Sequence, residues 1–190
     1  MKALMLIYDS YAEFEVMLVG LFLKGKAEVH MFTDKEDTSF VTGAGGFQTV
    51  PHVKISQVAP ADYDALIIPG GRHEALLNNS ALHELIREFN RQDKLIAAIC
   101  GGPVHLAAAG ILEGNAYTTS INSDDKTAGH LFNWTLQSED DVVYDNHILT
   151  AVGSAYVEFA VQLYKLLGLF GDEAEEHQTL AFFKNTKVIA

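Results

Sequence analysis

Short runs of consecutive apolar residues recur along the chain, each bounded by turn-forming residues. The clearest runs are ALMLIY (3–8), AEVHMF (27–32), ALIIP (65–69), LIAAI (95–99), AYTT (116–119) and HILTAV (147–152). Apolar runs of this length are typical of strands that are buried on both faces of a parallel sheet. We therefore predict a sheet strand at each of them.

Between these runs, apolar residues repeat at helical spacing. Three sets each share one helix face: Phe14, Met17, Leu18, Leu21 and Phe22; Leu82, Leu85, Ile86 and Phe89; Phe159, Ala160, Leu163, Leu166 and Leu167. Each set predicts a helix that covers the sheet with that face. Gly168 is expected to end the last helix.

Two further segments predict hairpins. FVTGAGGFQTVPHV (40–53) has two β-like halves around glycines, which indicates a hairpin inserted near the sheet edge. SEDDVVYDNHILTAV (138–152) predicts a second hairpin that turns at Asp145 and Asn146.

Strands that alternate with helices predict an α/β fold, in which a doubly wound, mostly parallel sheet carries helices on both faces. The 190 residues are expected to form one domain, residues 1–190, because no repeat or linker-like tract divides them. In such sheets, ligands bind beyond the carboxyl ends of the strands, where the strand order reverses. Candidate chemistry is therefore sought at the strand ends.

Composition and charge exclude several partners. The net charge is −12 and Lys and Arg form no cluster, which argues against nucleic acid. No apolar run approaches the roughly 20 residues that span a bilayer, and the first run is too short for a signal peptide. The single cysteine excludes an internal disulfide and fits a cytoplasmic location.

That cysteine, Cys100, lies where the run 95–99 meets a predicted helix, in AAICGGPVHL. Gly101 and Gly102 relieve crowding at such a turn, and Pro103 suits the first helical turn, so the segment predicts a nucleophile elbow. Amides at the helix start are expected to lower the thiol pKa and to offer an oxyanion a donor. The alternative is a cysteine that only packs in the core.

Two other strand ends supply matching parts. Gly70 and Gly71 follow the run 65–69 and let a backbone amide approach closely, which makes Gly71 a second candidate oxyanion donor. Glu13 and Glu15 fall in the first turn of the helix after the first strand. Carboxylates at that position also stabilise a helix simply through its dipole.

No metal or cofactor is predicted. Histidines and acidic residues never recur at ligand spacing with the cysteine. Asp124 and Asp125 are interpreted as a solvated loop, His130 is placed in a peripheral loop, and the glycines of TGAGG (42–46) are weak support for phosphate binding.

Three motifs in chain order resemble the ThiJ/PfpI superfamily: AEFE (12–15), IIPGG (67–71) and AAICGGP (97–103). This superfamily has a class I glutamine amidotransferase-like fold. It includes the parkinsonism-associated deglycase, PfpI-type intracellular peptidases, isonitrile hydratases and glutathione-independent glyoxalases. The resemblance covers nearly the whole chain, through AYTT (116–119) to a final helix at 159–168.

The resemblance implies a flavodoxin-like three-layer sandwich that forms a homodimer, with Cys100 as the reactive centre. By position in AEFE, Glu15 and not Glu13 corresponds to the family's protonated carboxyl, which hydrogen-bonds the sulfur. One proton shared by the two groups would let the sulfur carry charge, and the same contact would stabilise a sulfinic acid. The oxyanion donors would be the amides of Gly71 and Gly101.

Two departures from the family bear on the reaction. Peptidase-like members have a histidine directly after the cysteine, where this chain has Gly101; many others have one at the end of the strand aligned with 116–119, where this chain has Ser120. A thiol and its base must lie within hydrogen-bond reach, so peptidase or amidotransferase activity is disfavoured. His73, His105 and Ser120 are assigned to the rim of the pocket.

Three functions follow as hypotheses. In the first, Cys100 adds to a small carbonyl such as a 2-oxoaldehyde and Glu15 moves the proton, as in a glyoxalase or deglycase. In the second, the protein responds to oxidation of Cys100 in stress protection and has no turnover. In the third, it is a cysteine hydrolase. The expected partners are a small-molecule substrate and a second copy of the chain.

Overall fold

A seven-stranded sheet forms the middle layer of the protein in a computed structural model, which describes residues 1–37 and 39–186. The strand order is β5-β2-β1-β6-β7-β9-β8. The strands are β1 (Lys2–Leu6), β2 (Glu28–Thr33), β5 (Val53–Lys54), β6 (Ala65–Ile68), β7 (Leu95–Ile99), β8 (Val142–Asp145) and β9 (Ile148–Ala151). β8 pairs antiparallel with β9, and the other neighbouring strands pair in parallel.

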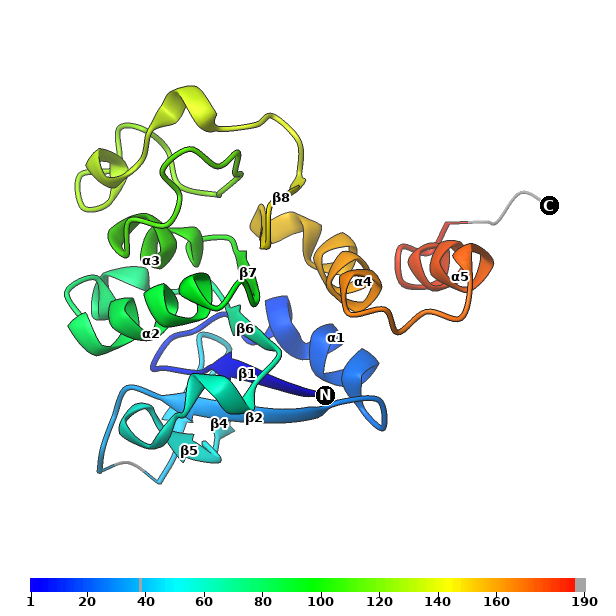
Figure 1. The fold of residues 1–190 in the computed structure, drawn as a ribbon, viewed down its shortest axis with the longest axis horizontal. Helices are drawn as coiled ribbons and strands as arrows, with labels where there is room; N and C mark the ends of the chain where they lie inside the picture. The colour runs from blue at the N-terminus through cyan, green and yellow to red at the C-terminus, as the bar shows by residue number, and fades with distance from the viewer. Residues whose placement is uncertain (38, 187–190) are drawn as a thin grey trace.

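Helices cover both faces of this sheet (Figure 1). α1 (Phe14–Leu23) and α4 (Tyr156–Leu166) pack together on one face, and α2 (Ser80–Arg91) and α3 (Pro103–Ala108) lie on the other. Short 3-10 helices complete the connections: η1 (Ile55–Gln57), η2 (Pro60–Asp62), η3 (His73–Leu76), η4 (Gly129–Leu131), η5 (Trp134–Leu136) and η6 (Gly153–Ala155). The predicted α/β sandwich is confirmed.

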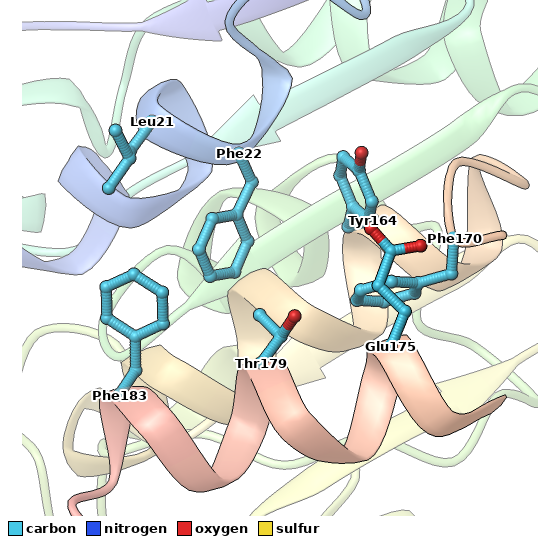
Figure 2. Close-up of a pocket in the computed structure, with 7 residues that line it drawn as sticks. All are labelled: Leu21, Phe22, Tyr164, Phe170, Glu175, Thr179 and Phe183. Atoms are coloured by element: carbon cyan, nitrogen blue, oxygen red, sulfur yellow. The ribbon is translucent and has the colours of Figure 1, made fainter. Parts of the chain in front are cut away.

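The last helix, α5 (Glu173–Phe183), packs against α4 on the side away from the sheet. Figure 2 shows the cavity of about 250 Å³ that this helix partly closes, with Leu21 and Phe22 of α1 facing Thr179 and Phe183 of α5. No residue of α5 is fully buried. The helix therefore adds little to the core.

Five of the six predicted strands are confirmed, because the runs at 3–8, 27–32, 65–69, 95–99 and 147–152 overlap β1, β2, β6, β7 and β9. The run 116–119 is not a strand. Within it only Tyr117 forms an isolated bridge, with Gln137. The Thr118 N–H instead bonds the side chain of Thr150, so the segment pairs with a side chain and not with a strand backbone.

The second predicted hairpin is confirmed as β8 and β9, with the turn one residue later than expected, at Asn146 and His147. The first predicted hairpin is present, but it does not lie at the edge of the main sheet. β3 (Val41–Thr42) and β4 (Gln48–Thr49) form their own two-stranded sheet. This β3–β4 hairpin is held on the segment after β1, because Ser10 N–H donates to Thr42 O (2.7 Å).

The predicted core face of α1 is wrong. Phe14, Met17 and Leu21 are 55%, 68% and 54% exposed. The buried residues are Glu15, Val16, Val19 and Leu23. Because nearly every residue of this helix is apolar, spacing alone could not select the inner face.

The other two predicted helix faces agree with the structure. All four apolar residues named for α2 are buried, and the Asn79 side chain caps the helix by accepting from Leu82 N–H (3.0 Å). In α4, Phe159, Ala160 and Leu163 are buried. That helix ends at Leu166, shortly before Gly168 with its positive φ of 68°.

The chain order places a reversal between β1 and β6. From β1 the chain builds outward through β2 to β5, and then returns to the other side of β1 with β6, β7 and β9. The segments after β1, β6 and β7 therefore meet at one edge of the sheet, which is where ligands bind in this architecture. None of the helices in residues 1–37 and 39–186 is long and apolar enough to cross a membrane.

Candidate active site

Cys100 directly follows β7 in a conformation that side chains rarely adopt. Its φ is 63°, in the left-handed region. Its N–H donates to Ala151 O (2.8 Å), and its C=O accepts from Ser120 N–H (3.0 Å) and from the Thr119 hydroxyl (2.8 Å). Strain that the surrounding structure fixes on both sides is typical of functional turns such as the nucleophile elbow.

Glycines make room for this thiol. A Cβ on Gly70 would lie 2.6 Å from Cys100 Cβ and 3.0 Å from Sγ. A Cβ on Gly153 would lie 3.0 Å from the same sulfur and 3.3 Å from Glu15 Oε1. Sequence reasoning missed Gly153, although it follows β9 much as Gly70 follows β6.

Glu15 reaches the sulfur from α1. Its side chain is buried, hydrogen-bonds Cys100, and accepts from Gly70 N–H through Oε2 (2.6 Å). Burial raises the pKa of this carboxyl to about 7, because desolvation outweighs the two hydrogen bonds that favour the charged form. Near neutral pH, Glu15 can therefore both take and give a proton.

The Cys100 thiol pKa is raised to about 11, so the prediction of a lowered pKa is wrong. Burial is the largest cause, followed by the negative charge of Glu15 and the hydrogen bond to it. The Ser120 hydroxyl and the Gly101 N–H also hydrogen-bond the sulfur and oppose the shift. Because both pKa values are raised, the pair keeps at least one proton at neutral pH.

Gly101 places a backbone N–H beside the thiol, and Gly71 lies next to Gly101. The Gly101 N–H bonds the sulfur. Gly71 has a φ of 113°, and a Cβ there would lie 2.3 Å from Ser10 O, so only glycine fits. Within the described residues, the Gly71 N–H donates no hydrogen bond. The role of these two N–H groups as oxyanion donors stays a prediction.

Glu13 has a different environment from Glu15. Its buried carboxylate accepts from Gly45 N–H (2.9 Å) and Phe47 N–H (3.4 Å), both in the loop of the β3–β4 hairpin. These bonds hold that loop against the start of α1. Glu13 therefore anchors the hairpin, and the carboxyl at the sulfur is Glu15.

The two candidate histidines do not lie at a rim. His105 is fully buried and His73 is 7% exposed, because α3 and η3 turn them toward the interior beside α2. His105 faces His83, with 6.3 Å between ring centroids. A Cβ on Gly101 would lie 3.2 Å from His73 Nδ1, so His73 is a close neighbour of the elbow.

These imidazoles are poorly paired. His73 Nε2, His83 Nε2 and both ring nitrogens of His105 are buried without a hydrogen-bond partner among the described residues. Burial lowers the His105 pKa to about 3, and nearby His83 and His73 add to the effect. Neither His73 nor His105 contributes a hydrogen bond to the Cys100 sulfur.

Ser120 is solvent-exposed and touches the thiol. Its oxygen accepts from Gly153 N–H (2.9 Å), so its own proton can point to the sulfur. A hydroxyl at this position orients the thiol but is too weakly basic to deprotonate it.

Within the described chain, no group of three or more His, Cys, Asp or Glu side chains could hold a metal ion. Asp125 closes its own loop, because its Oδ1 accepts from Thr127 N–H (2.9 Å) and Ala128 N–H (2.8 Å). These bonds, together with one from the Thr127 hydroxyl, lower its pKa to about 2.

Known proteins are similar to this chain in sequence. The profile of the DJ-1/PfpI family matches residues 1–166. The deglycase PfpI of Pyrococcus furiosus is 32% identical over 124 residues, which are 63% of this chain and 74% of that protein. An uncharacterized protein of Methanocaldococcus jannaschii is 36% identical over 120 residues, which are 60% of this chain and little more than half (56%) of that protein.

Solved structures match over almost the full length. A DJ-1 superfamily protein from Agrobacterium tumefaciens is 30% identical, with a TM-score of 0.84 over 97% of each chain. The oxidized form of Toxoplasma gondii DJ-1 is 26% identical, with a TM-score of 0.80 over 98% of this chain and 99% of that one. With residues 1–166 covered by its profile, this chain belongs to the DJ-1/PfpI family.

Proposed function

We propose that the protein is a cysteine-dependent enzyme that acts on small electrophilic carbonyl compounds, in the manner of a glyoxalase or deglycase. The observation that carries this proposal is the buried pair of Glu15 and Cys100, in which an acid with a pKa of about 7 hydrogen-bonds the thiol. The deglycase relatives from Pyrococcus and Thermococcus support the same class of reaction.

In the first step, the Cys100 sulfur bonds to the aldehyde carbon while the carbonyl electron pair moves to oxygen. Glu15 takes the thiol proton and returns it to that oxygen, which gives a hemithioacetal. The N–H groups of Gly71 and Gly101 would stabilise the negative charge that develops there. Because the proton leaves sulfur as the S–C bond forms, a free thiolate with a low pKa is not required.

For a 2-oxoaldehyde, the adduct then rearranges without any external oxidant. Glu15 removes the hydrogen on the first carbon as a proton and returns it to the neighbouring carbonyl carbon, while the hydroxyl proton passes to the ketone oxygen. The ketone thereby becomes an alcohol, and the first carbon is oxidised to a thioester. Water hydrolyses the thioester to a 2-hydroxy acid and restores the thiol. Both proton transfers suit a group whose pKa lies near the working pH.

The test is lactate release from methylglyoxal by the native protein and three variants. Cys100→Ser should abolish turnover, and Glu15→Gln should lower it at least about 100-fold, the usual contribution of a general base. Glu13→Gln is the matched control, because that side chain bonds the hairpin loop and not the sulfur. It should keep turnover within about threefold. Absence of turnover in the native protein would refute the proposal.

Oxidation of Cys100 in a stress-protective protein is the second candidate, favoured by the match to oxidized Toxoplasma gondii DJ-1. The raised thiol pKa counts against it, since the thiolate is the readily oxidised form. Peroxide treatment followed by intact-mass measurement decides the matter. An unchanged mass at low-millimolar peroxide would exclude an easily oxidised thiol.

Hydrolysis of peptides or amides is supported least. Neither His73 nor His105 forms a hydrogen bond with the Cys100 sulfur. If a thiol probe labels Cys100 while a panel of amide substrates stays intact, hydrolysis is excluded.

We also propose that a second copy covers the outer side of α1, in a cytoplasmic homodimer. A helix that is apolar on all sides is normally buried on all sides, yet Phe14, Met17 and Leu21 are exposed. Two copies with a charge of −12 each repel each other. The uncharged surface formed by these three residues is therefore where the copies can make contact. Sedimentation velocity should show a dimer that Met17→Glu converts to a monomer; a monomeric native protein would contradict this.

A further inference from the structure

Tyr8 lies two residues beyond β1 and is 1% exposed. Its hydroxyl donates to the backbone oxygen of Gly70 (2.8 Å). Burial and the negative charges that Glu15 and Cys100 can carry raise its pKa, so the hydroxyl stays protonated and remains a donor. The proposed reaction assigns no role to this side chain.

Gly70 is held on both sides of its α-carbon. Its N–H donates to Glu15 Oε2 (2.6 Å), and its C=O accepts from the Tyr8 hydroxyl (2.8 Å) and from Ala12 N–H (3.1 Å). The Tyr8 hydroxyl is therefore linked through one residue to the carboxyl that serves the thiol.

The orientation of the Gly70 carbonyl also fixes the next amide. The peptide bonds of the described residues are all trans, so the Gly71 N–H points opposite to the Gly70 C=O. Two consecutive glycines resist rotation of this peptide less than any other pair. A hydrogen bond from a rigid, buried phenol supplies the restraint that the glycines lack.

We propose that Tyr8 is a positioning residue, which holds Gly70 in place through its C=O, so that the Gly70 N–H stays on Glu15 and the Gly71 N–H faces the oxyanion. The proposal rests on the proposed function for the oxyanion role. Its link to Glu15 can be tested without turnover.

The test compares Tyr8→Phe with Tyr117→Phe. Phenylalanine keeps the buried ring and removes only the hydroxyl. Tyr117 is the matched control, because it is also fully buried and donates to a backbone oxygen, that of Asn133 (3.2 Å), away from the thiol. Thermal unfolding of both variants shows whether each is folded and how much stability each lost hydrogen bond accounts for.

The first readout is the pH dependence of Cys100 alkylation by iodoacetamide, which needs no oxyanion hole. A looser Gly70 N–H stabilises the Glu15 carboxylate less, so the midpoint near pH 7 should rise by about half a unit in Tyr8→Phe. It should stay unchanged in Tyr117→Phe. Adding Tyr8→Phe to Glu15→Gln should leave the alkylation profile of Glu15→Gln unchanged, because the group through which Tyr8 acts is then absent.

The second readout is methylglyoxal turnover, where Tyr8→Phe should lower kcat about tenfold and leave KM within twofold. An unshifted alkylation midpoint, or an equal shift in Tyr117→Phe, overturns the proposal. If native protein has no turnover, the proposed function fails, and the midpoint alone then decides whether Tyr8 positions Glu15.

Discussion

Two buried polar regions meet at the Cys100 elbow, and they differ in how their atoms are paired. On the α1 side, Glu15 and Cys100 bond each other and a backbone N–H group each. On the α2 and α3 side, the tilted rings of His105 and His83 lie side by side, and ring nitrogens of both lack a hydrogen-bond partner among the described residues. A base must itself be oriented by a partner, so the difference supports the proposal that Glu15 moves the proton, although histidine is the more common base.

The two regions also respond to pH with opposite sign. The pKa of Glu15 is raised to about 7 and that of His105 is lowered to about 3, each because burial favours the neutral form. The Glu15 contribution to stability is lost as pH rises, whereas the His105 contribution is lost as pH falls. Substitutions in each region test this contrast.

Gly70→Ala should have the largest effect, because it disrupts the carboxyl side directly. The new Cβ would lie 2.6 Å from Cys100 Cβ and 2.8 Å from Gly101 N, so backbone must move. We expect iodoacetamide alkylation to slow at least about fiftyfold and the free energy of unfolding to fall by about 1–3 kcal/mol. Gly20→Ala has no atom within 4 Å of its Cβ and should instead stabilise α1. If both variants kept the alkylation rate and the stability of the native protein, the backbone around Cys100 would have room for a Cβ at Gly70.

Glu15→Gln should remove the pH dependence of the carboxyl side. For an acid with an unfolded pKa of 4.5 and a folded pKa of about 7, stability present below pH 4.5 is lost as pH rises to about 7. The full term is about 3 kcal/mol. Between pH 5 and pH 8, the free energy of unfolding of the variant, measured with urea, should therefore rise relative to that of the native protein by about 2.5 kcal/mol. Glu13→Gln is the control, and a gap independent of pH would contradict the raised pKa.

His105→Leu tests the histidine side. A His with an unfolded pKa of 6.5 and a folded pKa of about 3 loses stability as pH falls below 6.5, by about 2 kcal/mol at pH 5. His83 faces the same ring, and the nearby charges of His83 and His73 lower the His105 pKa further, while burial and the charge of Arg87 lower the pKa of His83. Acidification therefore acts on His105 and His83 together. From pH 8 to pH 5, the free energy of unfolding of the variant should rise relative to that of the native protein.

Methylglyoxal turnover of His105→Leu should stay within about threefold, as should that of the exposed control His130→Leu. If His105→Leu alone lowered turnover 100-fold, His105 and not Glu15 would be the general base, since that is the size of a general-base contribution.

The smallest effect concerns the native protein alone. As Glu15 ionises with a pKa of about 7, it becomes able to take the thiol proton, so alkylation should accelerate about tenfold between pH 6 and pH 8. In Glu15→Gln the step should disappear. A native rate that rises only near pH 11 would mean that the thiol ionises without help from Glu15.

The sequence predicted the parts of the fold and site that local patterns determine. Unbroken apolar runs located five strands, the elbow motif selected Cys100, and the resemblance to a known family selected Glu15, which the structure brings into contact with Cys100. The burial of His105 depends on how α3 packs against α2, which no local pattern records. The outer side of α1 was misjudged for a related reason: a uniformly apolar helix does not show which side meets the sheet.

One consequence of α1 concerns how assembly and chemistry are linked. The same ten-residue helix carries Glu15 toward the sulfur and Met17 toward the outside. Because a short helix moves as one rigid unit, any displacement of its outer surface also displaces the Glu15 carboxyl. Quaternary contacts on that surface would thus tune how the proton is passed between oxygen and sulfur.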